Sequence, residues 1–415
     1  MNARTSSLRR GVVSVVVPVV TLAAAVTFWW SSLHLWFRPP ARDLGPPSEA
    51  RGSERVQALL RTQLDAWADG SSLEADVHAM RATNPEWDFM GRTYLVLALT
   101  SLASSSPSPT ERQGLLATAD RVIDETLRME AEHGQPYFLM QYVHASPFLD
   151  PRGRSIAIDG EIAMMLAARL VAGDRPELRP LLAERVDSIE TQMRAGPVLS
   201  AESYPDECWT FCNTTALAAI RMADHVDGRD HSDLVGAWLA TARARLVDPA
   251  TGLLVSSYRY DGTPLDGPEG STLWMTIHNL AVLDPAFARE QYQRAVPLLH
   301  RDVLGFGLAR EWPVAVSGPR APREGHPDVD SGPIIPGLDA SAGSSGMLML
   351  AAGTMDDRAT LASLLASLDL AAFPVRDGPR LRYAASNRVG DAVLLYALVE
   401  GPLRARVLAR AEVRS

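Results

Sequence analysis

The two cysteines are the residues whose type and spacing first suggest chemistry. Cys208 and Cys212 are the only cysteines and lie four residues apart, so on a helix they would share one face. Three roles are open for them: buried structural thiols, a disulfide, or functional thiols. Asp206 and Glu207 would raise the thiol pKa by their charge, which favours proton transfer over a thiolate nucleophile. We expect no disulfide within the pair, because side chains on successive helical turns lie side by side.

Carboxylates form the second group of candidates. Glu161 lies near the start of the apolar segment 160–173, where it either caps a helix or points into a cavity with a raised pKa. Asp328 and Asp330 in the sequence DVDSG resemble a metal-ligating turn, but no glutamate follows at the spacing of a calcium loop. The cysteines also lack a second ligand pair for zinc. We therefore expect no metal site.

The composition excludes several classes of protein. The chain has 415 residues and a formal net charge of −9, and all 40 of its basic residues are arginines. Pyridoxal-phosphate enzymes, lysine aldolases, P-loop proteins and kinases each need a particular lysine, so these classes are excluded. The acidic balance also makes a nucleic-acid partner unexpected.

Positive charge is concentrated at the N-terminus, ahead of a long apolar segment. Residues 11–37 carry no charge and are numerous enough to span a bilayer, and arginines precede them. We expect an uncleaved transmembrane anchor with the bulk of the chain outside the cytoplasm. A cleaved signal peptide, twin-arginine in type, and a buried core helix are the alternatives. No small-x-small cleavage site follows the apolar run, which favours the anchor.

The rest of the chain divides into a linker and one helical domain. We expect residues 1–10 to form a cytoplasmic tip, 38–53 a Pro- and Gly-rich linker, and 54–415 the domain. Apolar residues recur at helical spacing almost throughout the domain, and the clearest strand pattern is the short segment 253–260. Some twelve helices of this kind form a solenoid or a closed toroid of paired helices. The absence of a standard repeat period counts against a solenoid.

The loops between the helices carry polar and aromatic residues in dense groups. Trp87 and Asp88 lie in NPEWDF, and Asp206 and Trp209 lie in YPDECW. In a toroid, one set of such loops converges on a central cavity, and binding residues concentrate on loops held by a rigid scaffold. The other interpretation is that these segments are solvated helix connections, which explains their Asp, Pro and Gly but not their tryptophans.

The stretch from Tyr204 to about Gln293 resembles the linalool dehydratase/isomerase family. The resemblance rests on YPDECWTFCNTTALAAIRMADHVDG, AWLATARARLVDPATGLLVSSYRYDG and TLWMTIHNLAVLDPAFAREQY. It extends weakly to residues 160–174 and 328–353. It implies a closed toroid of paired helices around an apolar cavity. It also implies cofactor-independent addition or removal of water at an allylic or tertiary alcohol, with movement of the double bond.

The resemblance also assigns residues. The active-site cysteine before an asparagine falls on Cys212, before Asn213, and the second cysteine of the family falls on Ser203. The catalytic histidine after a glycine falls on Glu161, and the tyrosine of the SY loop on Tyr258. For the first aspartate of the family, Asp88 is the nearest acid.

These observations predict an all-α closed toroid behind one transmembrane helix. Acid–base catalysis would use Cys212, Glu161, Tyr258, Asp88 and Cys208 as catalytic candidates. The residues expected to bind the substrate are Trp87, Trp209, Asn213, Asp206, Asp328 and Asp330.

The expected partners are a small apolar or amphiphilic substrate, the membrane through the N-terminal helix, and a second copy of the chain in a homo-oligomer. Two alternatives stay open. A carbohydrate-active toroid would use Asp206 with Asp328 or Asp330. A non-catalytic toroid would bind a lipid or a protein.

Overall fold

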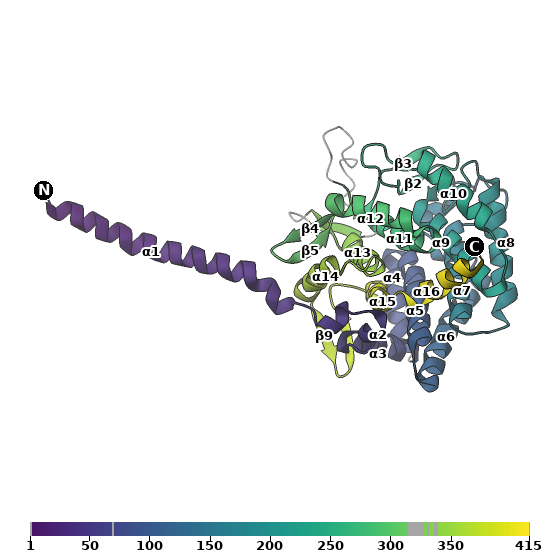
Figure 1. The fold of residues 1–415 in the computed structure, drawn as a ribbon, viewed down its shortest axis with the longest axis horizontal. Helices are drawn as coiled ribbons and strands as arrows, with labels where there is room; N and C mark the ends of the chain where they lie inside the picture. The colour runs from purple at the N-terminus through teal and green to yellow at the C-terminus, as the bar shows by residue number, and fades with distance from the viewer. Residues whose placement is uncertain (1, 69, 314–327, 330–331, 336–338, 415) are drawn as a thin grey trace.

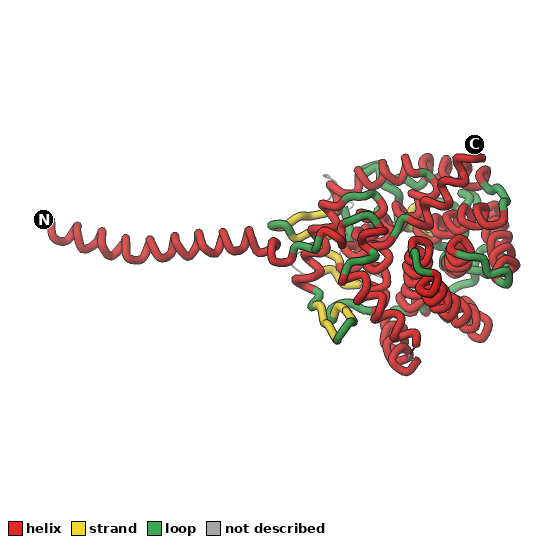
Figure 2. The backbone as a smooth tube through the Cα atoms, turned by 60° about the horizontal axis from the view of Figure 1, so that its bottom comes forward, coloured by secondary structure: helices red, strands yellow, loops and turns green. Residues whose placement is uncertain are grey.

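The computed structural model describes residues 2–68, 70–313, 328–329, 332–335 and 339–414. Helices dominate it, and short strands lie only in the connections between them (Figures 1 and 2). One apolar helix projects away from the helical domain, and the rest of the chain folds together.

Six inner helices form a closed ring, in which each packs against the next and the last packs against the first. They are α5 (Pro85–Ser105), α7 (Ile156–Ala172), α9 (Thr210–Asp227), α11 (Gly270–Leu283), α13 (Ala342–Thr354) and α15 (Arg388–Val399). These helices are apolar on nearly all sides, as expected for helices surrounded by others. The closed toroid predicted from the sequence is therefore confirmed.

The outer helices cover this ring and bury a single stripe each. In α6, for example, the buried residues recur at helical spacing from Leu115 to Thr126. The outer helices are α3 (Glu54–Ala68), α4 (Gly70–Thr83), α6 (Pro109–His133), α8 (Leu178–Ala195), α10 (Ser232–Arg245), α12 (Pro285–Leu299) and α14 (Arg358–Ala371). Each of α6, α8, α10, α12 and α14 follows an inner helix in the chain, which gives the paired arrangement.

Local sequence signals fix where the helices begin. Asn84, Ser108, Asp284 and Asn387 are N-caps whose side chains accept backbone N–H groups of the first turn. The first three are followed by proline, whose fixed φ suits the first helical position. At its C-terminal end, α9 is terminated by Gly228, which adopts the left-handed conformation.

The short strands form hairpins and small antiparallel sheets in the loops. The pairing orders are β1–β2–β3, β4–β5, β6–β7–β8 and β9–β10. Their bounds are β1 (Cys208–Trp209), β2 (Ser257–Tyr258), β3 (Pro264–Asp266), β4 (His300–Val303), β5 (Phe306–Ala309), β6 (Asp328–Val329), β7 (Gly332–Ile335), β8 (Ala340–Ser341), β9 (Pro374–Asp377) and β10 (Arg380–Tyr383). The 3₁₀ turns η3 (Gln135–Phe138) and η4 (Gln141–His144) lie between α6 and α7.

The C-terminal helix α16 (Pro402–Arg414) closes one end of the ring, where it packs against α5, α7, α9 and α11. Arg406 donates to the carbonyls of Ser104 and Val171, and Arg404 to that of Thr354. These carbonyls belong to the last turns of inner helices, where positive charge is favourable. The candidate functional site lies at the opposite end of the ring, where the inner helices begin.

The N-terminal helix α1 (Asn2–Ser32) continues into the 3₁₀ turn η1 (Leu33–Phe37). The segment Val16–Phe37 is apolar and long enough to cross a membrane or to act as a signal sequence. Because none of it is buried, the core-helix alternative is wrong. Among the described residues, its base touches the domain, where the Phe37 and His34 rings meet that of Phe306.

The segment expected as a linker folds onto the domain. Residues 38–53 contain η2 (Ala41–Leu44) and α2 (Pro47–Ala50). Asp43 is buried and accepts a hydrogen bond from the Arg55 Nε at 2.7 Å. The apolar helix is therefore joined to the ring through a short, packed connection.

Candidate active site

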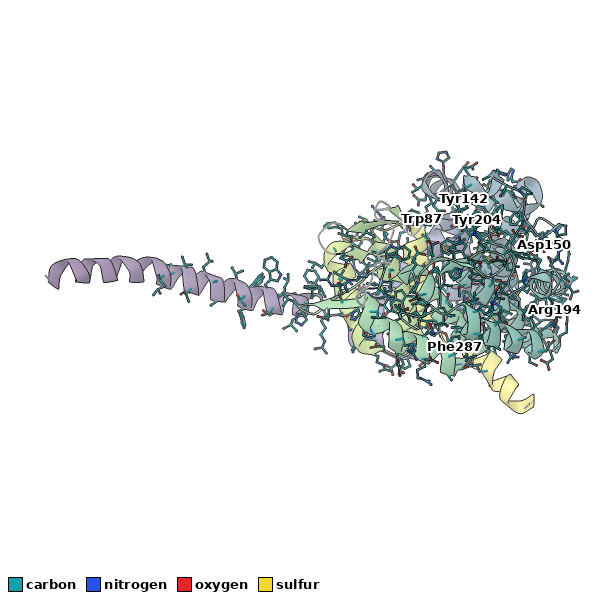
Figure 3. The ribbon with its side chains drawn as sticks, turned by 90° about the horizontal axis from the view of Figure 1, so that it is seen from above. Trp87, Tyr142, Asp150, Arg194, Tyr204 and Phe287 are labelled. Carbon is teal, nitrogen blue, oxygen red and sulfur yellow. The ribbon has the colours of Figure 1, made fainter. Side chains whose placement is uncertain are left out.

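A cavity of about 450 Å³ lies at the N-terminal end of the ring, opposite α16. The first turns of all six inner helices line it, and η3 and η4 add Phe138, Leu139 and Tyr142. Its ionisable lining residues are Glu86, Tyr142, Glu161, Tyr204 and Cys212, and no basic side chain is among those lining it. Most of the other lining groups are apolar. Figure 3 shows Trp87, Tyr142 and Tyr204 together on this face of the domain.

Glu161 points into this cavity rather than capping its helix. It lies five residues beyond the start of α7, is only 4% exposed, and accepts a hydrogen bond from the Thr93 hydroxyl at 2.6 Å. Burial raises the pKa of the Glu161 carboxyl to about 8, the Thr93 hydrogen bond acts against this, and the charge of Glu86 adds to it. Glu161 therefore faces the cavity, and the interpretation of Glu161 as a helix cap is wrong.

Asp159 is the acidic residue of the first turn of α7. It is fully buried and forms ion pairs with Arg154 and Arg185. Although burial alone would raise it, the pKa of Asp159 is lowered by these two guanidinium groups. Asp159 therefore stays ionised at the positive end of the helix, which leaves Glu161 free for the cavity.

Cys212 is the cysteine that faces the cavity. It lies in the first turn of α9 and is 8% exposed. Burial raises the pKa of its thiol, a hydrogen bond with Ser203 lowers it, and the charges of Glu86 and Glu161 raise it further. Ser203 stands where the resemblance expected a second cysteine, and its hydroxyl is the direct partner of Cys212.

Cys208 does not lie on the same helix as Cys212. It belongs to strand β1, before α9 begins at Thr210, so the predicted helical spacing of the two cysteines is wrong. It is fully buried, pairs with Tyr258 across β1 and β2, and is not among the cavity lining. Both thiols are free, as expected.

Tyr258 lies behind the cavity. Its hydroxyl is fully buried and donates to the Ser200 Oγ at 2.8 Å, and the Trp238 indole N–H reaches the same oxygen at 3.1 Å. Tyr258 is not among the lining residues. Of the catalytic candidates Glu161, Cys212 and Tyr258, the first two therefore line the cavity, whereas Tyr258 lies in β2 behind it.

Asp88 is an ion-pair partner, and its neighbour Glu86 takes the place expected for it. Asp88 is buried, lies 3.0 Å from the Arg92 Nε and 3.5 Å from the Arg81 Nη1, and does not line the cavity. Glu86 and Asp88 are both in the first turn of α5 and lie two positions apart. Their side chains therefore leave the helix in different directions. The sequence singled out the right segment but the wrong acid.

Glu86, Tyr204 and Tyr142 form a polar group that the sequence analysis did not identify. The Tyr204 hydroxyl donates to Glu86 and accepts the Met140 backbone N–H at 3.0 Å, and the Tyr142 ring stacks on Tyr204 at 4.3 Å. Burial and the charge of Glu86 raise the pKa of Tyr204. Tyr204 begins the YPDECW segment, so that segment carried a signal for this group.

The residues expected to bind substrate divide in the same way. Trp87 and Trp209 line the cavity. Asn213 does not line it, because its side chain bonds the backbone of Ala201 in both directions. Asp206 lies outside the cavity and pairs with Arg259.

The positions of the Asp328 and Asp330 side chains, the last two expected to bind substrate, are not described. For Asp328 the structure describes only the backbone, in β6, and Asp330 lies outside the described residues. Within the described part of the chain, no group of three His, Cys, Asp or Glu residues is arranged to hold a metal ion.

The fold and site define a class: a closed ring of paired helices whose inner N-termini surround a largely apolar, acid-containing cavity. Residues 183–389 match the family model of linalool dehydratase/isomerase. The match runs from within α8 to the start of α15 and is consistent with a divergent member of this family. The resemblance noted in the sequence is confirmed.

Two solved structures are similar at low identity. The GH76 α-mannanase of Bacteroides thetaiotaomicron has a TM-score of 0.43 and 11% identity, covering 78% of this chain and 87% of that chain. The unsaturated glucuronyl hydrolase of Bacillus sp. GL1 has a TM-score of 0.47 and 13% identity, covering 74% of this chain and 84% of that chain. None of the curated proteins compared with the sequence matches it.

Proposed function

We propose that the protein is a hydro-lyase or isomerase that acts by acid–base catalysis on a terpenoid or other lipid-like alcohol, without a cofactor. The observation that supports this most is the burial of Glu161 in the wall of a mainly apolar cavity. A carboxyl group with a pKa of about 8 in a mainly apolar cavity holds its proton at neutral pH. Such a group donates a proton to a hydroxyl, which is a poor leaving group without it.

Glu161 gives its proton to the hydroxyl of the substrate, and the C–O bond breaks to release water. Glu86, whose carboxylate accepts the Tyr204 hydrogen bond, removes a proton from the neighbouring carbon, and the C–H electron pair becomes the new double bond. In isomerisation, water instead returns to another carbon of the allylic cation and gives one proton back to Glu161, which restores the acid.

The remaining lining groups suit this step. The faces of Trp87 and Trp209 attract a developing carbocation, because the aromatic quadrupole is negative at the ring face. The raised pKa of Cys212 keeps its thiol protonated, so it serves as a second proton donor and not as a nucleophile.

The two alternatives receive less support from the site. The carbohydrate mechanism relied on Asp206, which is paired with Arg259 outside the cavity. A non-catalytic toroid would leave Glu161 and Cys212 buried away from any cavity, whereas both residues line this one.

We also propose that α1 is an uncleaved transmembrane anchor. It holds the domain on the extracytoplasmic face of the membrane that it spans. The segment Val16–Phe37 is 22 residues long, or about 33 Å as a helix, which matches a bilayer core. Phe37 would then lie at headgroup level, together with the β4–β5 turn that its contact with Phe306 holds there. An apolar substrate would reach the enzyme from the bilayer.

The anchor is tested by a fluorescent label on Leu304, an exposed residue of the β4–β5 turn, in full-length protein reconstituted in vesicles. Spin-labelled lipids should quench a label on Leu304→Cys. A label on Leu181→Cys, exposed on α8, is the control and should stay unquenched. Equal quenching at the two positions contradicts the proposed placement.

The reaction is tested by oxygen exchange, which detects reversible loss of water whatever product forms. Full-length protein is incubated in H₂¹⁸O with a panel of apolar allylic and tertiary alcohols, linalool and geraniol among them. We expect ¹⁸O in the hydroxyl of at least one alcohol. Glu161→Gln should reduce the exchange rate on the order of 10²-fold, because a positioned acid contributes about that much.

Glu290→Gln is the matched control for this experiment, because Glu290 is half exposed on α12 and pairs with Arg294 away from the cavity. It should exchange oxygen at the wild-type rate. Exchange by Glu161→Gln as fast as wild type, or no exchange with any alcohol of the panel, contradicts the proposed function.

A further inference from the structure

A second hollow lies beside the cavity and has a different character. This hairpin cleft, of about 630 Å³, is bounded by α3, α4, the β9–β10 hairpin and the first turn of α15. Its lining includes both acids and arginines, and Met80, Val375 and Leu381 add apolar surface. None of the groups in the proposed reaction lines it.

Two residues that line the cleft each carry a buried polar atom without a hydrogen-bond partner among the described residues. Asp391 is only 6% exposed, and its Oδ1 accepts no hydrogen bond, whereas the carboxyl as a whole accepts the Tyr383 backbone N–H. Arg388 uses its Nε and Nη2 on Asp76, at 2.7 and 2.6 Å, and its Nη1 has no acceptor. Buried polar atoms are normally satisfied, so this pair indicates a missing partner.

The two atoms call for a particular kind of partner. Arg388 and Asp391 lie three residues apart on α15 and so face the same side. One atom needs an acceptor and the other a donor. A hydroxyl is both, so one hydroxyl or an adjacent pair of them satisfies both atoms.

The charges around the cleft select against an ionic ligand. Arg380 pairs with Asp65 at 2.8 Å, and Asp76 is already neutralised by Arg388. The Asp391 carboxyl lies within the influence of Arg382 and Arg388, so the charges around the cleft largely offset one another. The apolar side chains of the lining suit the C–H face of a polyol or sugar ring.

We propose that the hairpin cleft binds a neutral polyhydroxylated group, one hydroxyl of which donates to Asp391 and accepts from Arg388. Ser386 and Asn387 line both the cleft and the cavity, so the two hollows lie on either side of one short ridge. The group is therefore either a free polyol or the head of an amphiphile whose apolar part enters the cavity. The amphiphile source rests on the proposed function, whereas the cleft site itself does not.

The experiment measures binding of methyl β-glucoside and octyl β-glucoside to full-length protein in lipid nanodiscs, by titration calorimetry. Both probes carry the same polyhydroxylated ring, and only the second has an apolar tail. We expect saturable binding of both probes. Tighter binding of octyl than of methyl β-glucoside identifies the amphiphile source, and equal affinity identifies a free polyol.

Variants assign the binding to the cleft. Asp391→Asn and Arg388→Gln should each weaken binding of methyl β-glucoside at least tenfold. Asp391→Asn retains an oxygen for the Tyr383 N–H, which protects the fold, and Arg388→Gln tests the other half of the pair. Asp356→Asn and Arg358→Gln alter an exposed ion pair beside α14 and should bind as wild type does.

Two results overturn the proposal: no saturable binding of either probe, or undiminished binding by both Asp391→Asn and Arg388→Gln. Because these probes are not substrates of the proposed reaction, failure here leaves the ¹⁸O exchange result unaffected. The two proposals therefore fail separately.

Discussion

The Thr93 hydroxyl on α5 donates to Oε2 of Glu161 on α7, with 2.6 Å between the two oxygens. This bond joins neighbouring inner helices at the cavity wall and stabilises the ionised form of Glu161, against the effect of burial. Burial therefore raises the pKa of this proposed proton donor and the Thr93 hydrogen bond lowers it, and the hydrogen bond can be changed separately.

Thr93→Val should raise the pKa of Glu161 above about 8, because it removes the hydrogen bond that favours the carboxylate. The alkaline limb of the pH–rate profile for oxygen exchange should then move to higher pH. Thr93→Ser restores a hydroxyl and should bring the limb back. An unchanged limb in Thr93→Val would show that this bond does not tune the acid.

The thiols offer a test that needs no substrate. Because burial raises the pKa of both Cys208 and Cys212, neither should react with a disulfide reagent in native protein at pH 7. After unfolding without reductant, both free thiols should react. Rapid reaction of one native thiol would mean an accessible thiolate and exclude the proton-donor role, and no reactive thiol after unfolding would mean a disulfide.

Packing between α7 and α9 positions the two main groups of the site. A Cβ on Gly160 would lie 3.1 Å from the Cβ and backbone N of Ala216, so the glycine lets the helices approach closely. Gly160→Ala should destabilise the protein by about 1–3 kcal/mol in urea unfolding, as overpacking does. Gly236→Ala on α10, where the added Cβ meets nothing within 4 Å, should cost no stability. Equal effects of the two substitutions would contradict this packing role.

Much of the fold could be predicted from the sequence, because it depends on local periodicity. The helical pattern and the loops rich in Trp and Asp indicated a toroid, and the converging N-termini followed from helix pairing. Glu161 and Cys212 reach the cavity because each lies in or just after the first turn of an inner helix.

The errors concern side-chain direction, which spacing within a short loop does not determine. Glu86 and Asp88 lie two positions apart on α5, and only three-dimensional packing shows that Glu86 lines the cavity while Asp88 pairs with Arg92. The four-residue spacing predicts one helix for Cys208 and Cys212 because no residue between them marks a strand, yet Cys208 lies in β1. Tyr204 and the Asp391–Arg388 pair depend on contacts between distant segments, which a single sequence does not reveal.

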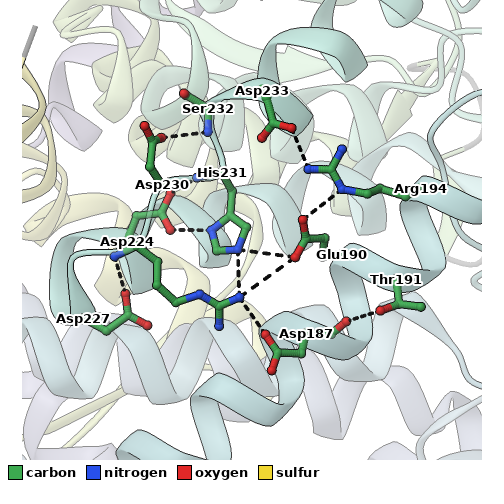
Figure 4. A network of polar contacts seen from close by, with 11 residues as sticks. Asp187, Glu190, Thr191, Arg194, Asp224, Asp227, Asp230, His231, Ser232 and Asp233 are labelled. Atoms are coloured by element: carbon green, nitrogen blue, oxygen red, sulfur yellow. Dashed lines mark hydrogen bonds and ion pairs between the residues drawn. The ribbon is translucent and has the colours of Figure 1, made fainter.

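A buried histidine outside the site should make stability depend on pH. His231 lies among α8, α9 and α10, where its Nδ1 is 2.5 Å from the Asp224 Oδ1 and its Nε2 is 3.6 Å from Glu190 (Figure 4). Asp224 raises the pKa of His231 above its ordinary 6.5, although burial and Arg229 oppose this. The protonated form is therefore favoured by folding.

The sign of the effect follows from linkage. The contribution of His231 is fully present below about pH 6.5 and is lost as the pH rises through the raised folded-state pKa. In urea unfolding of detergent-solubilised protein, the stability difference between wild type and His231→Gln should be largest at pH 6 and should shrink at higher pH. A difference that stays constant or grows with pH contradicts this assignment.

The protonation state of Glu161 is the central claim, and it can be measured directly. Carbon-13 NMR of protein labelled at the glutamate carboxyl carbons follows each carboxyl through a pH titration, and the signal missing from Glu161→Gln identifies this residue. We predict a midpoint near pH 8, so that the group is mostly protonated at pH 7. A midpoint near 4.5, the ordinary value, would leave a carboxylate in the cavity at neutral pH and contradict its role as the proton donor.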